Sequence, residues 1–139
     1  MPHSTPLLQT APWFQRSTGK TINTATINML GQPFVNAIVA PVWGNVNTGT
    51  AWSDHSLNAQ FNTLTGTIGR IDGTGVDAST ISFIGDGREL ATFTIDGNTN
   101  PTEISVDVTG VLVLRIQIHV GGWVMNPGAR PALANAMIQ

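Results

Sequence analysis

The stretch Val111-Leu-Val-Leu-Arg-Ile-Gln-Ile-His-Val120 decides the fold class of this chain. Side chains in a β-strand point alternately to opposite faces, so a period of two in hydrophobicity marks a strand with one buried face. One face of this stretch is fully apolar and carries Leu112, Leu114, Ile116, Ile118 and Val120. The opposite face carries Val113, Arg115, Gln117 and His119. The pattern predicts a strand that is buried on one side and partly hydrated on the other.

Shorter segments with the same character surround this strand. Thr, Val and Ile are abundant in them, and Gly-containing turns separate them, most clearly at Asp86-Gly87. The expected strands are Thr21–Met29, Phe34–Val39, Phe61–Ile68, Thr80–Ile84, Glu89–Ile95, Glu103–Thr109, the stretch above and Pro131–Gln139. About eight strands without long helical periods predict an all-β protein, an antiparallel β-sandwich of the jelly-roll type.

Composition restricts the partners of the chain. Its 139 residues fit one domain, which we divide into an N-terminal arm, residues 1–20, and a sandwich, residues 21–139. Only 10% of the residues are charged, the net charge is −2, and the six basic residues are scattered singly. Nucleic acid and anionic membranes usually leave a basic footprint, so neither is an expected partner. The absence of Cys excludes disulfides, thiolate zinc sites and cysteine nucleophiles.

The N-terminal segment has neither the basic start nor the apolar core of a signal peptide. No apolar run approaches the roughly 18 residues of a membrane-spanning helix. Three prolines and the cluster Pro12-Trp13-Phe14 characterise the arm, and the cluster is suited to pack it onto the sandwich. These features leave the native compartment open.

Candidate catalytic residues are sparse. Ser53, Asp54, His55 and Ser56 could form a triad on paper, but the chain has no Gly-x-Ser-x-Gly elbow. Adjacent residues of a strand also point to opposite faces, which separates Asp54 from His55. Two carboxylate pairs, Asp86 with Glu89 and Asp72 with Asp77, could be considered for glycoside hydrolysis. Turn formation is the simpler explanation for Asp72 and Asp86, since Asp accepts local backbone N–H groups in turns. We expect no enzymatic activity.

The loop Asp72-Gly-Thr-Gly-Val-Asp77 offers oxygen donors on a flexible backbone, which suits calcium. It does not match an EF-hand loop, and a plain surface turn is the simpler interpretation. Asp72 and Asp77 are therefore weak calcium candidates, and no other cofactor is expected.

The tryptophans suggest a binding site instead. A Trp in a polar loop exposes apolar area to water unless it packs or binds a ligand. A sugar offers an apolar C–H face and a rim of hydroxyls, which an aromatic ring and polar side chains can match. The candidate ligand-binding residues are Trp43, Trp52, Asp54, His55 and Trp123. The alternative for each Trp is that it fills an end of the sandwich.

The order of several segments resembles a known family. The run Thr63-Leu-Thr-Gly-Thr-Ile-Gly69 is followed by Ile81-Ser-Phe-Ile-Gly-Asp-Gly-Arg-Glu-Leu90 and then by Ile104-Ser-Val-Asp-Val-Thr-Gly-Val111. In this order, from Thr21 to Ile138, the chain is similar to the NPCBM family of carbohydrate-binding modules, although Ile38–Trp52 has no clear counterpart. The resemblance implies a galactose-binding-like jelly roll without catalysis. It further implies a carbohydrate partner and an extracellular or cell-surface location, usually beside a glycoside hydrolase or surface protein.

A second function class stays open. A weakly charged, Thr- and Asn-rich sandwich is also typical of self-assembling structural or adhesion proteins in virions, filaments or shells. An arm such as residues 1–20 could then dock on another copy and form a homo-oligomer. Packing of the arm on its own body would favour the binding module.

Overall fold

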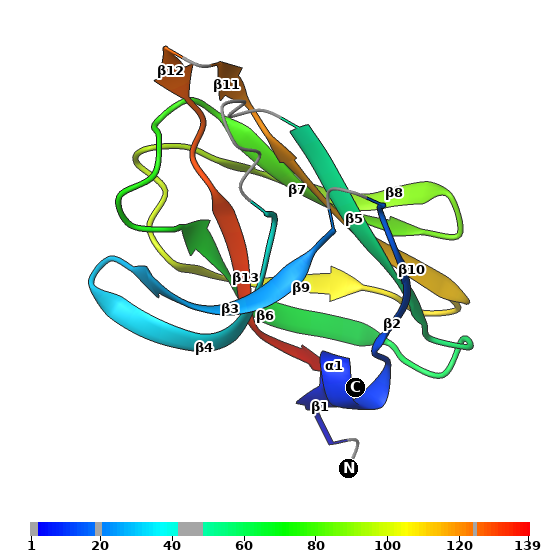
Figure 1. Ribbon diagram of the computed structural model, residues 1–139. Coiled ribbons are helices and arrows are strands. Elements are labelled where there is room, and N and C mark those ends of the chain that lie inside the picture. Colours follow the sequence, from blue (N-terminus) through cyan, green and yellow to red (C-terminus); the bar gives the residue numbers. More distant parts are fainter. Residues whose placement is uncertain (1–2, 19–20, 42–48, 124) are drawn as a thin grey trace.

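The structure, a computed structural model, describes residues 3–18, 21–41, 49–123 and 125–139. Two antiparallel sheets face each other, and a short hairpin stands at one end (Figure 1). The strands in chain order are β1 (Thr5–Pro6), β2 (Trp13–Arg16), β3 (Asn23–Met29), β4 (Gln32–Val39), β5 (Gly49–Ser56), β6 (Thr63–Arg70), β7 (Ser79–Gly85), β8 (Arg88–Ile95), β9 (Thr102–Asp107), β10 (Val113–Val120), β11 (Gly122–Trp123), β12 (Asn126–Pro127) and β13 (Pro131–Ile138). One short helix, α1 (Leu7–Thr10), lies in the arm.

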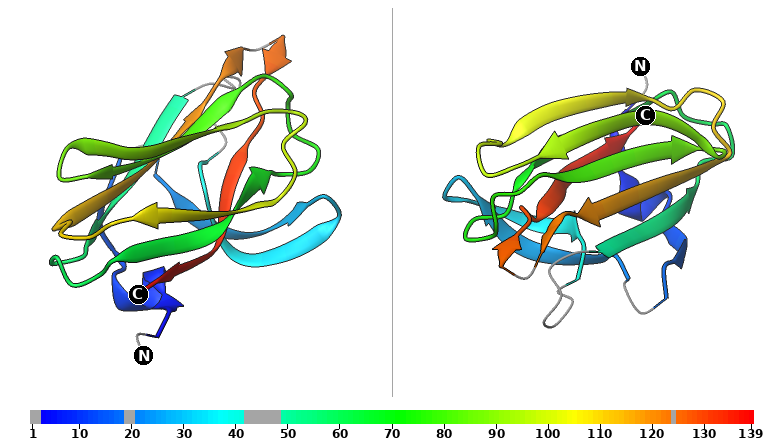
Figure 2. Two further views of the ribbon diagram at one scale, coloured as in Figure 1. Left: turned by 180° about the vertical axis from the view of Figure 1, so that it is seen from behind. Right: turned by 90° about the horizontal axis from the view of Figure 1, so that it is seen from above.

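The two layers are built by strands that are distant in sequence. The first sheet has the order β3-β4-β13-β6-β9, with β1 paired to β13, and the second has the order β2-β5-β10-β7-β8. Seen from above in Figure 2, the two layers stack across a shared interior. The all-β antiparallel sandwich expected from the sequence is confirmed, with thirteen strands in the described part of the chain where about eight were expected.

The central strand β10 has the two faces that its alternation predicts. Leu114, Ile116, Ile118 and Val120 are buried in the main core, whereas Arg115 and His119 face outward. Leu112 is the exception, because it precedes the strand and 57% of its surface is exposed. The interior between the sheets is filled by aliphatic residues and Phe83, which explains the aliphatic alternation of the inward faces.

The Asp86-Gly87 turn connects β7 and β8 as a hairpin, as expected. Asp86 and Gly87 have φ values of 51° and 82°, and a turn with two positive φ values favours Gly in its second position. The Asp86 carboxylate accepts hydrogen bonds from the backbone N–H groups of Leu112 and Val113, at 3.1 and 2.9 Å. These bonds hold the pKa of Asp86 below its usual value and join the hairpin to the start of β10.

The arm is part of both sheets. β1 pairs with β13 and β2 pairs with β5, while Leu7 and Ala11 lie in the main core. Residues 3–18 therefore belong to the sandwich, and the division at residue 20 does not separate two structural units. The arm packs on its own body, which is the outcome that favours a binding module over arm exchange between copies.

β5 is the element that the sequence pattern missed. The sequence pattern predicts no strand at Gly49–Ser56, but this segment pairs with β10 along its full length and with β2 at its other edge. Its alternation is weak because the inward face carries Ala51, Ser53 and His55, which are buried although two of them are polar. Within the described residues, no helix is long and apolar enough to cross a membrane.

Candidate functional site

The structure distributes the predicted site residues over different places. Trp52 and Asp54 point outward from β5, whereas His55 points inward and has no exposed surface. Trp123 lies in the β11–β12 hairpin at the far end from α1 (Figure 1). Trp43 lies outside the described residues. Burial corrects the expectation for His55, which cannot contact a ligand at the surface.

Trp52 and Asp54 share their face with Arg115 of the neighbouring strand. The Arg115 guanidinium donates to both Asp54 carboxylate oxygens, at 2.8 and 3.0 Å. Its central carbon also lies 3.9 Å from the centroid of the Trp52 ring, a cation–π contact. Arg115 and Asp54 border a depression of about 390 Å³, which is also lined by Ile84, Asp86, Gly87 and Val113.

This arrangement changes the role expected for Trp52. The guanidinium covers a ring face that would otherwise be free to stack on a sugar. The ring and the carboxylate together hold Arg115 in one orientation, since a bidentate pair fixes the guanidinium plane. Trp52 and Asp54 therefore both support Arg115, which is the exposed member of the group, since the Asp54 side chain is only 10% exposed.

His55 belongs to a buried polar chain that anchors the arm. Its Nδ1 lies 2.8 Å from the backbone oxygen of Ala11, and its Nε2 lies 2.9 Å from the Ser53 hydroxyl. The Ala11 oxygen is an acceptor, so Nδ1 carries the proton and Nε2 of the neutral ring accepts from Ser53. Trp13 packs edge-on against the ring at a centroid distance of 6.3 Å.

The Ser53–His55 bond has the geometry of a nucleophile and its base, but it serves the fold. Neither side chain has exposed surface, so no substrate can reach them. A backbone carbonyl of the arm takes the position that an acidic residue would hold in a triad. The pair is structural.

Stability is expected to fall as the pH decreases below about 6.5. Burial lowers the pKa of His55 below its ordinary value of 6.5, so in this range the unfolded chain binds a proton that the folded chain does not. The free energy of unfolding then decreases by up to about 1.4 kcal/mol per pH unit until the folded pKa is reached. Asp86 and Asp107, whose pKa values lie below 3.8, lose their contribution only in stronger acid. Thermal unfolding across this range measures the slope.

The matched variants for this measurement are His55→Gln and His119→Gln. His119 is exposed, whereas His55 is fully buried, so only the first substitution should flatten the dependence of the melting temperature on pH. If the melting temperatures of the wild type and His55→Gln depended on pH in the same way, groups other than His55 would be responsible for the loss of stability.

The β11–β12 hairpin presents the second aromatic candidate. Trp123 is 56% exposed, and two further apolar residues, Met125 of the same hairpin and Val76 next to Asp77, are 74% and 63% exposed. With the Asn126 amide oriented to satisfy both of its polar atoms, its oxygen accepts a hydrogen bond from Trp123 Nε1 at 3.1 Å. We call Val76, Asp77, Trp123, Met125 and Asn126 the hairpin end.

The base of this hairpin is tightly fixed. The buried Ser79 hydroxyl donates to the Ala129 oxygen at 2.6 Å and accepts from the Gly121 N–H at 2.9 Å. Gly122 has a φ of 79°, and a Cβ there would overlap the backbone of Asn126 and Gly128. The base of the hairpin, which leads into Trp123, is therefore held by the body of the domain.

Most carboxylates of the chain are engaged in the fold. Asp72, the first calcium candidate, accepts the backbone N–H groups of Leu30 and Gly31 at 2.8 Å, one on each oxygen. These two hydrogen bonds join the loop to the β3–β4 turn, and they give the Asp72 carboxylate a structural role that needs no metal. In the described ranges, no three His, Cys, Asp or Glu side chains lie close enough together to hold a metal ion.

Two carboxylates have no hydrogen-bonding or ionic partner among the described residues, Asp77 and Glu103. The other six bind Arg115, a backbone N–H or a Thr hydroxyl. Asp77 belongs to the hairpin end, because its backbone oxygen accepts from the Ala129 N–H at 2.8 Å and it forms a bridge with Gly128. The hairpin end thus contains an exposed indole and an amide, and the backbone of Asp77, whose carboxylate is unpaired, is attached at its base.

Comparison with known proteins identifies the family. A family model described as the NPCBM/NEW2 domain matches residues 44–138, which is about two thirds of the chain. The chain belongs to the NPCBM/NEW2 domain family. The match begins later than Thr21, so the arm and the β3–β4 hairpin lie outside the segment that carries the family signal. No protein of curated function matches the sequence significantly.

Solved structures share the NPCBM/NEW2 fold at low sequence identity. A CBM51 module from Clostridium perfringens GH95, in complex with methyl-galactose, has a TM-score of 0.72 and 15% identity, with 99% of this chain and 100% of that chain covered. The CBM51-2 and INT domains from Clostridium perfringens ZmpB, in complex with GlcNAc, give a TM-score of 0.71 and 15% identity. That match covers 98% of this chain and 31% of the other.

A third structure holds tandem CBM51 modules of Sp3GH98, a family 98 glycoside hydrolase from Streptococcus pneumoniae SP3-BS71. It matches with a TM-score of 0.66 and 11% identity, over 91% of this chain and 44% of that chain. This chain therefore spans less than half of the second and third structures. By family and fold, the NPCBM/NEW2 domain described here is a carbohydrate-binding module.

Sequence reasoning missed Arg115 and Asn126, and it considered Asp77 only as a weak calcium candidate in a surface turn. Arg115 was placed correctly on the outward face of β10, but its contacts with Trp52 and Asp54 follow from the pairing of β10 with β5. Asn126 is adjacent to Trp123 only because β11 and β12 pair. The sequence signal for the hairpin was Gly121-Gly122 beside a tryptophan.

Proposed function

We propose that this domain binds a glycan at the hairpin end and does not catalyse a reaction. The exposed Trp123 indole at the end of the sandwich carries the proposal. Its ring would stack on the apolar face of a sugar, while the Asn126 amide and the Asp77 carboxylate bind hydroxyl groups. Membership of a family of carbohydrate-binding modules supports this function.

Trp52 and Asp54 enter the proposal through Arg115. The guanidinium that they orient keeps a side-chain exposure of 37%, which allows it to donate hydrogen bonds to an additional sugar unit. Contact of a sugar with Arg115 would give Trp52 and Asp54 a role on the outer sheet face, because both orient the guanidinium. Stacking is assigned to Trp123, since Arg115 already covers the Trp52 ring.

The sugar classes to test first come from the similar structures. One of these proteins holds methyl-galactose and another holds GlcNAc, so both are reasonable probes for this chain. An extracellular or cell-surface location, beside a glycoside hydrolase or surface protein, is part of the proposal because glycans of this kind are displayed there.

A glycan array probed with the purified domain tests the function. We expect retention on a restricted set of glycans by a monomer, as measured by light scattering on the same sample. The retained glycan should be recovered with its mass unchanged, as expected for a module that binds without catalysis. A large ordered assembly without any array signal would overturn the proposal in favour of a structural protein.

A further inference from the structure

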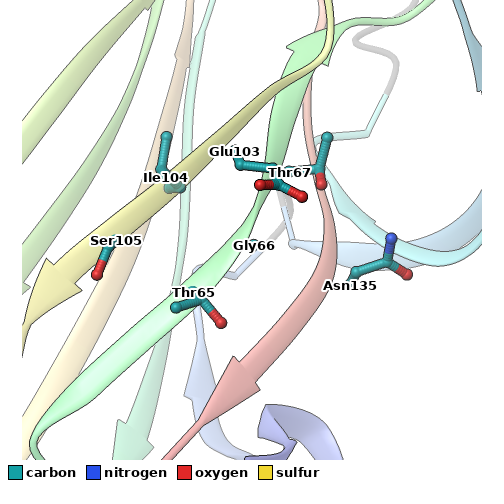
Figure 3. Close-up of a pocket in the computed structure, with 7 residues that line it drawn as sticks. All are labelled: Thr65, Gly66, Thr67, Glu103, Ile104, Ser105 and Asn135. Atoms are coloured by element: carbon teal, nitrogen blue, oxygen red, sulfur yellow. The ribbon is translucent and has the colours of Figure 1, made fainter.

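A second hollow lies on the outward face of the first sheet. It measures about 470 Å³ and extends over β9, β6 and β13 (Figure 3). Its lining residues are Thr65, Gly66, Thr67, Glu103, Ile104, Ser105 and Asn135. The side chains that reach the outward face are polar, because β6 and β9 alternate there with buried aliphatic residues.

Strand register brings these polar groups together. Thr67 lies opposite Glu103, and Thr65 lies opposite Ser105, so two cross-strand pairs follow one another on the same face. In Figure 3 the Glu103 carboxylate extends over β6 towards Thr67, and Thr65 lies further along the same strand. The hollow therefore has a carboxylate at one position and hydroxyl groups beside it.

A bulge in β13 completes the hollow. Ala134 pairs with Thr67 but Met137 pairs with Thr65, so β13 carries one extra residue across this step. Asn135 occupies the bulge with a φ of 53°, a conformation that costs a non-glycine residue energy and is concentrated at functional sites. Asn135 is among the lining residues of the hollow, and in Figure 3 its side chain lies beside β13 on the side away from Thr65 and Thr67.

The polar side chains that line the hollow make no hydrogen bonds or ion pairs to other described residues. Within the described residues, no hydrogen bond or ion pair involves the side chains of Thr65, Thr67, Glu103, Ser105 or Asn135. Asp86 and Asp107, by contrast, each accept backbone N–H groups that stabilise turns. Five polar side chains with free hydrogen-bonding capacity surround one hollow, and the fold itself does not use them.

We propose that this hollow is a second carbohydrate subsite, which binds a neutral sugar by two adjacent hydroxyl groups. A carboxylate accepts two hydroxyl hydrogens at once, and the Asn135 amide and the Thr hydroxyls both donate and accept. The lining contains no Arg or Lys, so an anionic ligand would meet the Glu103 charge without compensation. The choice of a sugar rests on the proposed function, whereas the hollow and its free groups do not.

The subsite is separate from the hairpin end. Thr65 and Thr67 precede Arg70, where β6 ends next to Pro131, by five and three residues. At about 3.4 Å per residue, they lie about 10 to 17 Å from that end of the strand.

Titration of the ¹⁵N-labelled chain with methyl-galactose and with GlcNAc tests the subsite residue by residue. For at least one sugar we expect two sets of shifted amides, one around residue 123 and one at residues 65–67, 103–105 and 135. Glu103→Gln should lower the sugar affinity fitted to the second set of amides at least tenfold, because it removes a charged acceptor. The affinity fitted to the first set should stay unchanged. Glu89→Gln, an exposed glutamate of the other sheet, is the matched charge control and should change neither set.

Asn135→Gly is the second variant, since glycine accepts the positive φ and only the amide is lost. This variant should lower the sugar affinity fitted to the second set of amides without lowering the melting temperature. Shifts confined to residue 123 would overturn the subsite and leave the proposed function standing, whereas Trp123→Ala tests the latter alone. A second set that responds to calcium chloride but to neither sugar would also overturn the inference and indicate a cation site.

Discussion

Trp123→Ala is expected to abolish glycan retention while the melting temperature stays unchanged. The side chain is 56% exposed and is absent from the buried core, so its removal leaves no cavity. Its backbone position is fixed independently by the Ser79 hydroxyl and the Gly122 turn. A tryptophan at the centre of a binding surface contributes about 2 kcal/mol or more, which corresponds to at least about 30-fold weaker binding.

The measurement is isothermal titration of the best array glycan with the wild type and the variant, beside thermal unfolding of both. Phe14→Ala is the matched control, because Phe14 is an aromatic residue of β2 with 57% exposure that lies away from the hairpin end. It should bind like the wild type. Trp123→Phe should retain part of the affinity, since it keeps a smaller ring. Equal affinities for the wild type and Trp123→Ala would exclude the hairpin end as the site.

The fold could be predicted because its signals are local. The alternation of β10 and the Asp86-Gly87 turn each lie within ten residues, and both were found in the structure. The connection from Asp107 to Val113 shows the limit of such signals. Its two strands are adjacent in sequence but belong to different sheets, since β9 pairs with β6 and β10 pairs with β5 and β7.

The site could be predicted only in part, because its geometry depends on pairing between distant segments. Whether Trp52 is a loop residue or a strand residue depends on β5 pairing with both β2 and β10. The same pairing buries His55 under Ala11, which is 44 residues away. The hollow at Asn135 depends on a bulge that has no marker in the sequence, since asparagine occupies a position where glycine would be expected.

His55→Ala is expected to destabilise the domain strongly and to loosen the arm. The substitution leaves a cavity where the ring was, and it removes the partners of the buried Ser53 hydroxyl and Ala11 carbonyl. Each buried polar group without a partner costs about 1 to 3 kcal/mol, and the cavity adds to this. We expect a loss of about 3 to 5 kcal/mol in the free energy of unfolding, which lowers the melting temperature by about 10 °C or more.

Chemical denaturation measures the loss, and hydrogen exchange across residues 5–16 reports the arm separately. Ser53→Ala removes only one of the two hydrogen bonds and should cost about 1 kcal/mol. His119→Ala, which removes an exposed bond to Thr50, should cost less still. Because the arm supplies β1 to one sheet and β2 to the other, faster exchange in both segments is expected only for the His55 variant. A cost no larger than that of His119→Ala would mean that strand pairing alone holds the arm, and that the polar chain through His55 contributes nothing to its attachment.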